Sequence, residues 1–208
     1  MPVLSQTHTN QYKINLKKSI QKNSKVTFAD SLNKKLVTKK SISAIFLGIG
    51  GGISIPLSPF INNSDVTFGI LGRLEFASTS IFPFVIGGEV DYFSYSGSDE
   101  FKTQNLLNTF DTKILSVGLN IEYSLSKILR SSFTMPFLTI DVKNNLIKRE
   151  YDSDTTFADL SREESKISIG AGFGFTLFIF DFYAKYNYMK GNSNIGVYTK
   201  TKIPIIRF

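Results

Sequence analysis

The segment Lys166 to Ile179, which reads KISIGAGFGFTLFI, alternates between two kinds of residue. All its odd positions are apolar, and its even positions are Lys, Ser, Gly or Thr apart from Phe178. A period of two predicts a β-strand, because successive side chains point to opposite faces of a sheet. A face of glycines and small hydroxyls suits a confined interior better than bulk water. The pattern is therefore typical of a transmembrane barrel strand, with lipid outside and a narrow polar lumen inside.

Seven other segments share this alternation, and no helical period interrupts them. Most are near the ~9 to 11 residues that a tilted strand needs to cross a bilayer. Their connections alternate between long and short, as in outer-membrane barrels with loops at one end and turns at the other. We predict an all-β, eight-stranded, antiparallel up-and-down transmembrane β-barrel over residues 44–208. The predicted strands are 44–55, 66–76, 82–92, 115–123, about 134–143, 166–179, 180–188 and 197–208, and the long connections are 56–65, 93–114, 144–165 and 189–196.

The chain ends in Arg207 and Phe208 after a strand-like run. This ending resembles the terminal signature of bacterial outer-membrane barrels, where a last aromatic residue is read by the assembly machinery. Residues 44–208 as a whole resemble the small eight-stranded outer-membrane barrels of the OmpA and OmpX type. The resemblance implies a place in the bacterial outer membrane and contact with outer-membrane lipid and lipopolysaccharide. It also implies recognition by the barrel-assembly machinery through the C-terminal strand, with Phe208 as the signal, and a monomeric state.

The last strand departs from the pattern in two ways. Pro204 removes a donor from the hydrogen-bond ladder, and Lys200 and Lys202 share the parity of Phe208, which would turn both lysines outward. Either the lysines lie above the lipid or a bulge resets the alternation. The sequence leaves the register of this strand open.

Positive charge is concentrated at the N-terminus. Residues 1–43 hold nine Lys and one acidic residue, for a net charge of +8, whereas residues 44–208 hold 15 basic and 16 acidic residues, for a net charge of −1. Because the basic balance belongs to one terminal segment, nucleic-acid binding is poorly supported. We expect 1–43 to be a basic, flexible leader, and the numbered start to carry a signal-peptide remnant if the protein is exported. An arm that binds lipid headgroups or cell-wall polymer is the alternative.

The residue types present exclude several kinds of chemistry. Cysteine is absent, which excludes disulfides, thiolate metal sites and cysteine nucleophiles. The single histidine, His8, lies in the leader, so a hydrolase site on the barrel has no imidazole base. We therefore expect no enzymatic activity and no cofactor. The uncharged stretch 41–64 is too rich in Gly and Pro to form a membrane helix.

The glycine-rich run Gly48 to Ile53 does not fit a dinucleotide-binding fingerprint. Its third glycine is replaced by Ile53, and Pro56 blocks the helix that would hold the phosphate. We expect these glycines to face the lumen and to let the strands pack closely.

An acidic pattern in the connection 144–165 has part of the spacing of a calcium loop. Asp152, Asp154 and Glu163 match ligand positions, but Phe157 stands where the sharp turn needs glycine. We expect a solvated acidic loop and no metal site. Weak divalent-cation or lipopolysaccharide-bridging binding at the three carboxylates is the alternative.

Charged residues on the small-residue face form the main candidate site. In an eight-stranded barrel the interior is just wide enough for side chains to fill it. Because unpaired buried charge is costly, we expect mixed charges to form a paired plug, with a narrow gated pore as the alternative. We expect Arg73 to bridge Glu75 or Glu122, and Lys185 to meet Glu89 or Asp141. The full lumen set is Arg73, Glu75, Glu89, Asp91, Glu122, Asp141, Lys143, Lys166, Asp181 and Lys185.

Aromatic residues lie near both ends of the predicted strands, as interfacial belts require. The expected turn-end group is Phe76, Phe82, Phe84, Tyr123, Phe133, Phe137, Phe180 and Phe182, and the loop-end group is Tyr92, Tyr95, Tyr186, Tyr188 and Tyr198.

From these patterns we expect an integral outer-membrane protein with a structural or surface-interaction role and a side-chain-filled lumen. Its contact surface is expected in 93–113 and 144–165. One alternative is a narrow channel or a small hydrophobic-ligand transporter. A second is a soluble, lipocalin-like ligand-binding barrel, which would require the Ile and Phe rows to point inward.

Overall fold

The computed structural model describes residues 41–126, 128–129, 134–152 and 161–208. Eight antiparallel strands follow one another in chain order, and β8 pairs with β1 to close a barrel. The prediction of an eight-stranded up-and-down barrel is thus confirmed. The strands are β1 Ser43–Pro56, β2 Thr67–Ser78, β3 Phe84–Ser96, β4 Phe110–Ser124, β5 Thr134–Tyr151, β6 Glu163–Leu177, β7 Phe180–Tyr188 and β8 Asn194–Arg207.

The alternation of the sequence decides which way each side chain points. In β6, Ile167, Ile169 and Phe173 are exposed on the outer wall, whereas Ser168 and Gly170 are buried. The same holds around the barrel, where Leu119 is 70% exposed and Arg73 only 2%. The apolar rows therefore cover the outside. A lipocalin-like barrel needs the reverse arrangement, so that alternative is wrong.

The strands on one side of the barrel are longer than predicted. β4 begins at Phe110, β5 continues to Tyr151 and β6 begins at Glu163, so much of the predicted connections 93–114 and 144–165 is strand. The boundaries were wrong because the outer face there is polar, with exposed Asn144 and Lys148, while the alternation itself continues. Strands that extend beyond an apolar belt do not need an apolar outer face.

A β-bulge settles the register of β8. Leu47 of β1 pairs with Ile203 and Phe46 with Pro204, but Ile45 pairs with Ile206, so one extra residue is inserted in β8. Lys200 consequently points into the lumen while Phe208 is exposed on the outside. Bulges re-aim side chains at the end of a strand in this way.

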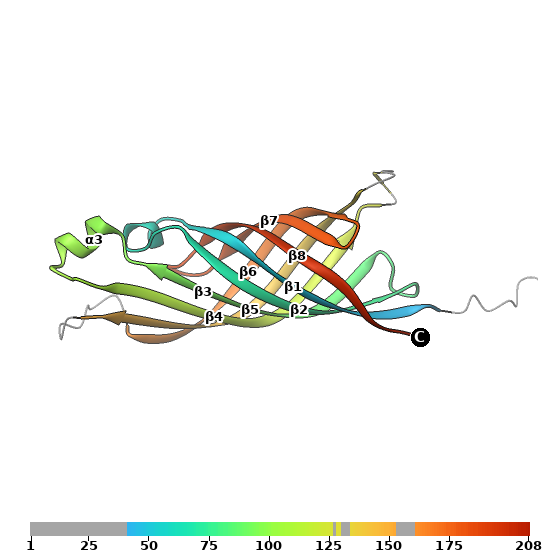
Figure 1. Ribbon diagram of the computed structural model, residues 1–208, viewed down its shortest axis with the longest axis horizontal. Coiled ribbons are helices and arrows are strands. Elements are labelled where there is room, and N and C mark those ends of the chain that lie inside the picture. Colours follow the sequence, from blue (N-terminus) through green and yellow to red (C-terminus); the bar gives the residue numbers. More distant parts are fainter. Residues whose placement is uncertain (1–40, 127, 130–133, 153–160) are drawn as a thin grey trace, which may run out of the picture. The chain divides into compact units, whose positions relative to one another are not determined.

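Two short helices lie in the loops at one end of the barrel, and the C-terminus lies at the other end (Figure 1). They are the 3-10 helix η1 Phe60–Asn62 between β1 and β2, and α3 Asp99–Gln104 between β3 and β4. Within the described residues, no helix has the length and apolar character to span a bilayer.

Candidate functional site

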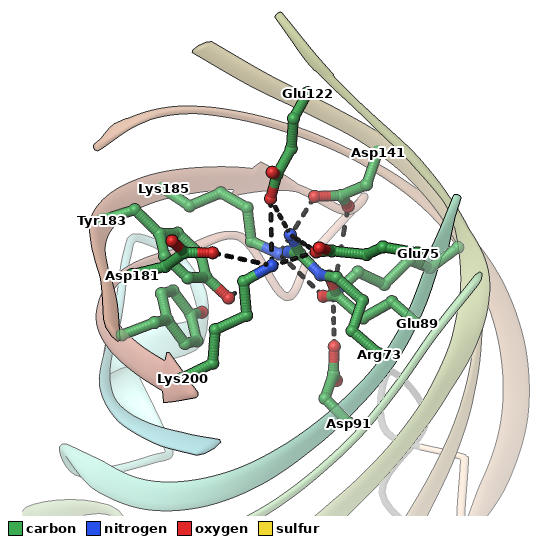
Figure 2. Close-up of polar contacts among 12 residues, drawn as sticks. Arg73, Glu75, Glu89, Asp91, Glu122, Asp141, Asp181, Tyr183, Lys185 and Lys200 are labelled. Atoms are coloured by element: carbon green, nitrogen blue, oxygen red, sulfur yellow. Dashed lines mark hydrogen bonds and ion pairs between the residues drawn. The ribbon is translucent and has the colours of Figure 1, made fainter. Parts of the chain in front are cut away.

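The interior of the barrel contains a dense group of charged side chains (Figure 2). Strands β2, β3, β4, β5, β7 and β8 contribute to it, because each turns alternate residues inward. We call this group the lumen network. Its described members are the six carboxylates Glu75, Glu89, Asp91, Glu122, Asp141 and Asp181, and the five cations Arg73, Lys143, Lys185, Lys200 and Lys202.

The part of the network nearer the turns is centred on Glu122 and Glu75. Arg73 Nη1 donates to Glu122 Oε1 at 2.5 Å and lies 3.5 Å from Glu75 Oε1, so the guanidinium contacts both carboxylates proposed from the sequence. Lys200 Nζ contacts Glu75 and lies 3.1 Å from Glu122 Oε1. Lys202 Nζ lies 3.0 Å from the second oxygen of each glutamate. Each carboxylate therefore faces several cations, which offsets part of the cost of burial.

The second part of the network is centred on Glu89. Its carboxylate contacts Arg73, lies 2.5 Å from Lys143 Nζ and accepts from Lys185 Nζ at 3.1 Å. Lys185 also lies 3.0 Å from Asp141 Oδ2, and Lys143 contacts Asp91. Because Arg73 contacts the carboxylates of both parts, the two form one connected network.

Glycines on neighbouring strands make room for the long lumen side chains. A β-carbon at Gly50 would lie 2.6 Å from Lys200 Cα, and one at Gly118 would lie 2.7 Å from Lys143 Cα. The expectation that the glycine-rich run lets strands approach closely therefore has a specific reason at Gly50. Any side chain there would occupy the space of β8.

Aromatic rings fill the rest of the lumen. Tyr183 stacks on Tyr198 with ring centroids 5.1 Å apart, and the Phe137 ring is tilted against Tyr183 with centroids 6.2 Å apart. Phe93 and Tyr95 continue the series toward the loops. Phe137, Tyr95 and Tyr198 were expected in the outer belts, and the structure places them inside. The inward parity of Phe137 and Tyr95 was available in the sequence, whereas Tyr198 shares the parity of Lys200, whose face depends on the β-bulge in β8.

The sequence did not predict two of the lumen cations, Lys200 and Lys202. Lys166, which it did assign to the lumen, lies at the edge of the lumen network. Lys200 and Lys202 were not assigned to the lumen because the bulge in β8 was not recognised. Lys166 does have the inward parity but lies at the loop-end mouth, where it pairs with Glu164 at 2.9 Å. Arg149 joins the same pair, 2.7 Å from Glu164. Phe133, expected in the turn-end belt, lies outside the described residues.

Three lumen carboxylates lie close enough to hold a metal ion. Oxygens of Glu75, Glu122 and Asp181 lie within 4.8 Å of one another. However, Lys200 and Lys202 each contact all three. The two ammonium groups therefore supply the positive charge that a cation would bring.

The acidic pattern in the β5–β6 connection does not form a calcium loop among the described residues. Asp152 accepts hydrogen bonds from Asn108, at 2.7 Å from its side chain and 3.0 Å from its backbone. The side-chain bond from Asn108 holds the pKa of Asp152 below its ordinary value. Glu163 is the first residue of β6, and Asp154 lies outside the described residues. Asp152 thus ties two loops together.

Further contacts join the loops at this end of the barrel. Ser98 donates through its hydroxyl to the carbonyl of Asn62 at 3.1 Å, which links the β3–β4 loop to η1. Ser98 is also the N-cap of α3 and accepts from the backbone N–H of Phe101. With the Asn108 to Asp152 bonds, these contacts connect three successive loops. We call this connected surface the loop platform.

The lumen has little free volume at the loop end. A cavity there has a volume of about 20 Å³ and is lined by polar and aromatic residues that include Asp91, Tyr95, Lys143, Asn187 and Tyr198. A cavity of this size has room for about one water molecule. The geometry therefore describes a packed interior.

Comparisons with known proteins give matches of structure only. No protein-family model and no curated protein matches the sequence. Neisserial surface protein A superimposes with a TM-score of 0.52 at 15% identity, over 79% of this chain and 99% of that one. The N-terminal barrel domain of Pseudomonas aeruginosa OprF (TM-score 0.45, 10% identity, 78% and 97% covered) and Yersinia pestis Ail (0.43, 14%, 81% and 99%) also match. The closed barrel and its likeness to Neisserial surface protein A show that the chain has the fold of the small eight-stranded outer-membrane β-barrels of the OmpA and OmpX type.

Proposed function

We propose that this protein is an integral protein of the bacterial outer membrane that acts as a structural or surface-interaction barrel. One observation carries the proposal: the apolar residues face outward all round the barrel, while the charged residues are paired inside it. In water this distribution would be unfavourable, because exposed apolar patches larger than a few hundred Å² are rare on soluble monomers. In a bilayer it is what a spanning barrel requires.

The filled lumen favours a structural role over conduction. Arg73 and Lys185 each lie within ion-pair distance of Glu89 in the interior, and the Tyr183 and Tyr198 rings occupy the space beside them. Opening a path for water would require these pairs to separate, and breaking a buried pair costs about 3–5 kcal/mol. A narrow channel is thus the weaker alternative.

The loop platform is the proposed contact surface. Its loops are held together by the Ser98 and Asp152 hydrogen bonds, so a partner would meet a preformed surface. Preorganisation lowers the entropy cost of binding. Outer-membrane lipid and lipopolysaccharide are the proposed surroundings of the outer wall. The proposed assembly signal is the exposed Phe208 at the end of β8, and the proposed state is a monomer.

Two measurements test this function. On a detergent gel, unboiled protein should run at a different apparent size from boiled protein, because closed membrane barrels resist detergent until they are heated. In a planar bilayer, the refolded protein should show no large, steady conductance. Unshifted mobility would refute the membrane barrel, whereas steady conductance would refute only the filled lumen and favour the channel.

A further inference from the structure

The turn between β6 and β7 consists entirely of apolar residues. β6 ends at Leu177 and β7 begins at Phe180, so the turn itself is Phe178 and Ile179. The Phe178 side chain is 82% exposed, and Ile179 is exposed as well. Two-residue hairpin turns that meet water are normally built from Asn, Asp or Gly. An exposed apolar pair at this position argues that the turn does not lie in water.

The backbone of this turn is held in a conformation that Phe does not favour. Phe178 has a φ of 57°, in the left-handed region that Gly and Asn adopt more easily. A strained residue that is kept in place of Gly or Asn suggests a role for its side chain. Leu106, in the β3–β4 loop, has the same features, with a φ of 55° and 92% exposure. Strain and exposure are therefore shared by the two ends of the barrel, and the surroundings of Phe178 decide what covers it.

The β6–β7 turn lies short of the end of β8. The last pair between β7 and β8 is Phe180 with Thr201, and β8 continues for six more residues to Arg207. At about 3.3 Å per residue, this extension is roughly 20 Å long. It is paired with β1 alone, and in Figure 1 the C-terminus lies beyond the β6–β7 turn. The turn is thus recessed from the β1–β8 end of the barrel.

The surface between the turn and the end of β8 is also apolar. The backbone N–H of Lys202 donates to the carbonyl of Ile179 at 2.7 Å, so it points toward the turn. N–H groups alternate along a strand, and the next one on this side would belong to Pro204, which has none. An edge without a free N–H suits hydrocarbon, where an unpaired backbone donor is costly. The exposed residues of this part of β8 are Ile203, Pro204, Ile205 and Ile206.

We propose that lipid acyl chains cover the β6–β7 turn, so that on this side the barrel ends inside the bilayer. We call the covered surface, Phe178 and Ile179 with residues 203–206 of β8, the turn recess. It is continuous with the apolar outer wall through Phe180 and Phe182 of β7, both of which are exposed. The inference rests on the proposed membrane barrel, because acyl chains reach the turn only along that wall.

The β2–β3 turn is built differently. The hydroxyls of Ser78 and Ser80 lie 3.1 Å and 2.8 Å from the Ser41 hydroxyl, and Thr79 and Ser80 are exposed. Hydroxyl groups of this kind suit contact with water or lipid headgroups. The two turns therefore suit different depths at the same end of the barrel.

The first test measures the depth of the turn by fluorescence. The chain contains no Trp, so a single introduced Trp is its only indole. Phe178→Trp, Leu119→Trp and Leu106→Trp are each refolded as the full chain in phosphatidylcholine vesicles, with and without bromine on the acyl chains. Bromine quenches an indole that it touches, so Phe178→Trp should lose most of its emission, as should Leu119→Trp on the outer wall. Leu106→Trp is the matched control in φ and exposure, and it should keep its emission.

The second test uses the same substitution at both strained residues. Asn adopts the left-handed conformation more easily than Leu or Phe, so Leu106→Asn should raise the midpoint of unfolding by urea. Phe178→Asn should lower the midpoint in vesicles, because an amide would replace an aromatic ring in hydrocarbon. The opposite signs do not depend on the Trp variants.

Each contrary result has a separate meaning. If Leu119→Trp is quenched and Phe178→Trp is not, the turn recess is wrong and the membrane barrel stands. If Phe178→Trp emits at shorter wavelength but is not quenched, protein covers the turn, as in contact with a second copy of the chain, and the lipid proposal is overturned. A midpoint that rises in Phe178→Asn as it does in Leu106→Asn would place the turn in water. An unquenched Leu119→Trp would refute the membrane barrel and the turn recess together.

Discussion

Replacing Gly50 by alanine should disrupt the seam that closes the barrel. Gly50 lies on β1 opposite Lys200 of β8, and its missing side chain faces the lumen. An added β-carbon would contact the carbonyl oxygen of Thr199 and lie 2.6 Å from Lys200 Cα. Both are backbone atoms, so no rotation of a side chain relieves the overlap. The two strands would have to separate, and Lys200 would be drawn away from Glu75.

The expected loss in free energy of unfolding is best measured against alanine at a second glycine of the same sheet. Overpacking a closely packed site costs typically about 1–3 kcal/mol, and the upper end applies where only the backbone can move. Gly72 faces outward on β2, and a β-carbon there would have no atom within 4 Å. Gly72→Ala should be neutral or stabilise the strand by roughly 0.5–1 kcal/mol. The two alanine variants should therefore differ by about 3–4 kcal/mol in free energy of unfolding.

The assay is equilibrium unfolding by urea of both variants and the parent in the same lipid vesicles. Gly50→Ala should lower the midpoint without a large change in slope, and it should lower the temperature at which the gel mobility shifts. Equal stability of the two variants would refute the reasoning, because it would mean that the β1–β8 seam has room for a β-carbon.

Three other perturbations have defined outcomes. Arg73→Leu should cost about 3–5 kcal/mol in free energy of unfolding by urea, because it leaves buried carboxylates short of a cation; a cost below 1 kcal/mol would contradict the network. Leu119→Lys, on the outer wall at mid-height of β4, should cost about 2–4 kcal/mol in vesicles; an unchanged or more soluble protein would contradict the lipid-facing assignment. The hydrogen bond from Asn108 lowers the pKa of Asp152, so the link between the β3–β4 and β5–β6 loops is stabilising when Asp152 is ionised. This stabilisation is fully present above pH 3.8, the ordinary pKa, and is lost as the pH falls through the lower pKa of the folded state. A carboxyl NMR titration of Asp152 should show this lowered pKa, and Asn108→Ala should raise the pKa toward the ordinary value without reaching it, because the backbone N–H groups of residues 108 and 109 still donate to Asp152.

The pattern of β6 shows how far the sequence alone could go. Its period of two predicts a strand and assigns Phe173 to one face and Gly172 to the other without any knowledge of neighbours. The inward positions of Arg73 and Glu122 follow from the same counting. Counting alternate positions gave the wrong face in β8, because the bulge between Ile203 and Ile206 puts Lys200 and Phe208 on opposite faces although both numbers are even. A bulge is one extra residue, and its position depends on the partner strand.

The sequence by itself determined the number of strands, their antiparallel order and the face on which most side chains lie, because these depend on local alternation and on the lengths of the connections. Only the tertiary structure decided which charges meet, how far β5 and β6 extend, and that the bulge in β8 turns Lys200 into the lumen. Those features depend on the register between strands that are distant in the chain. Register is set by how side chains from several strands fill one narrow lumen, and no single stretch of sequence contains that information.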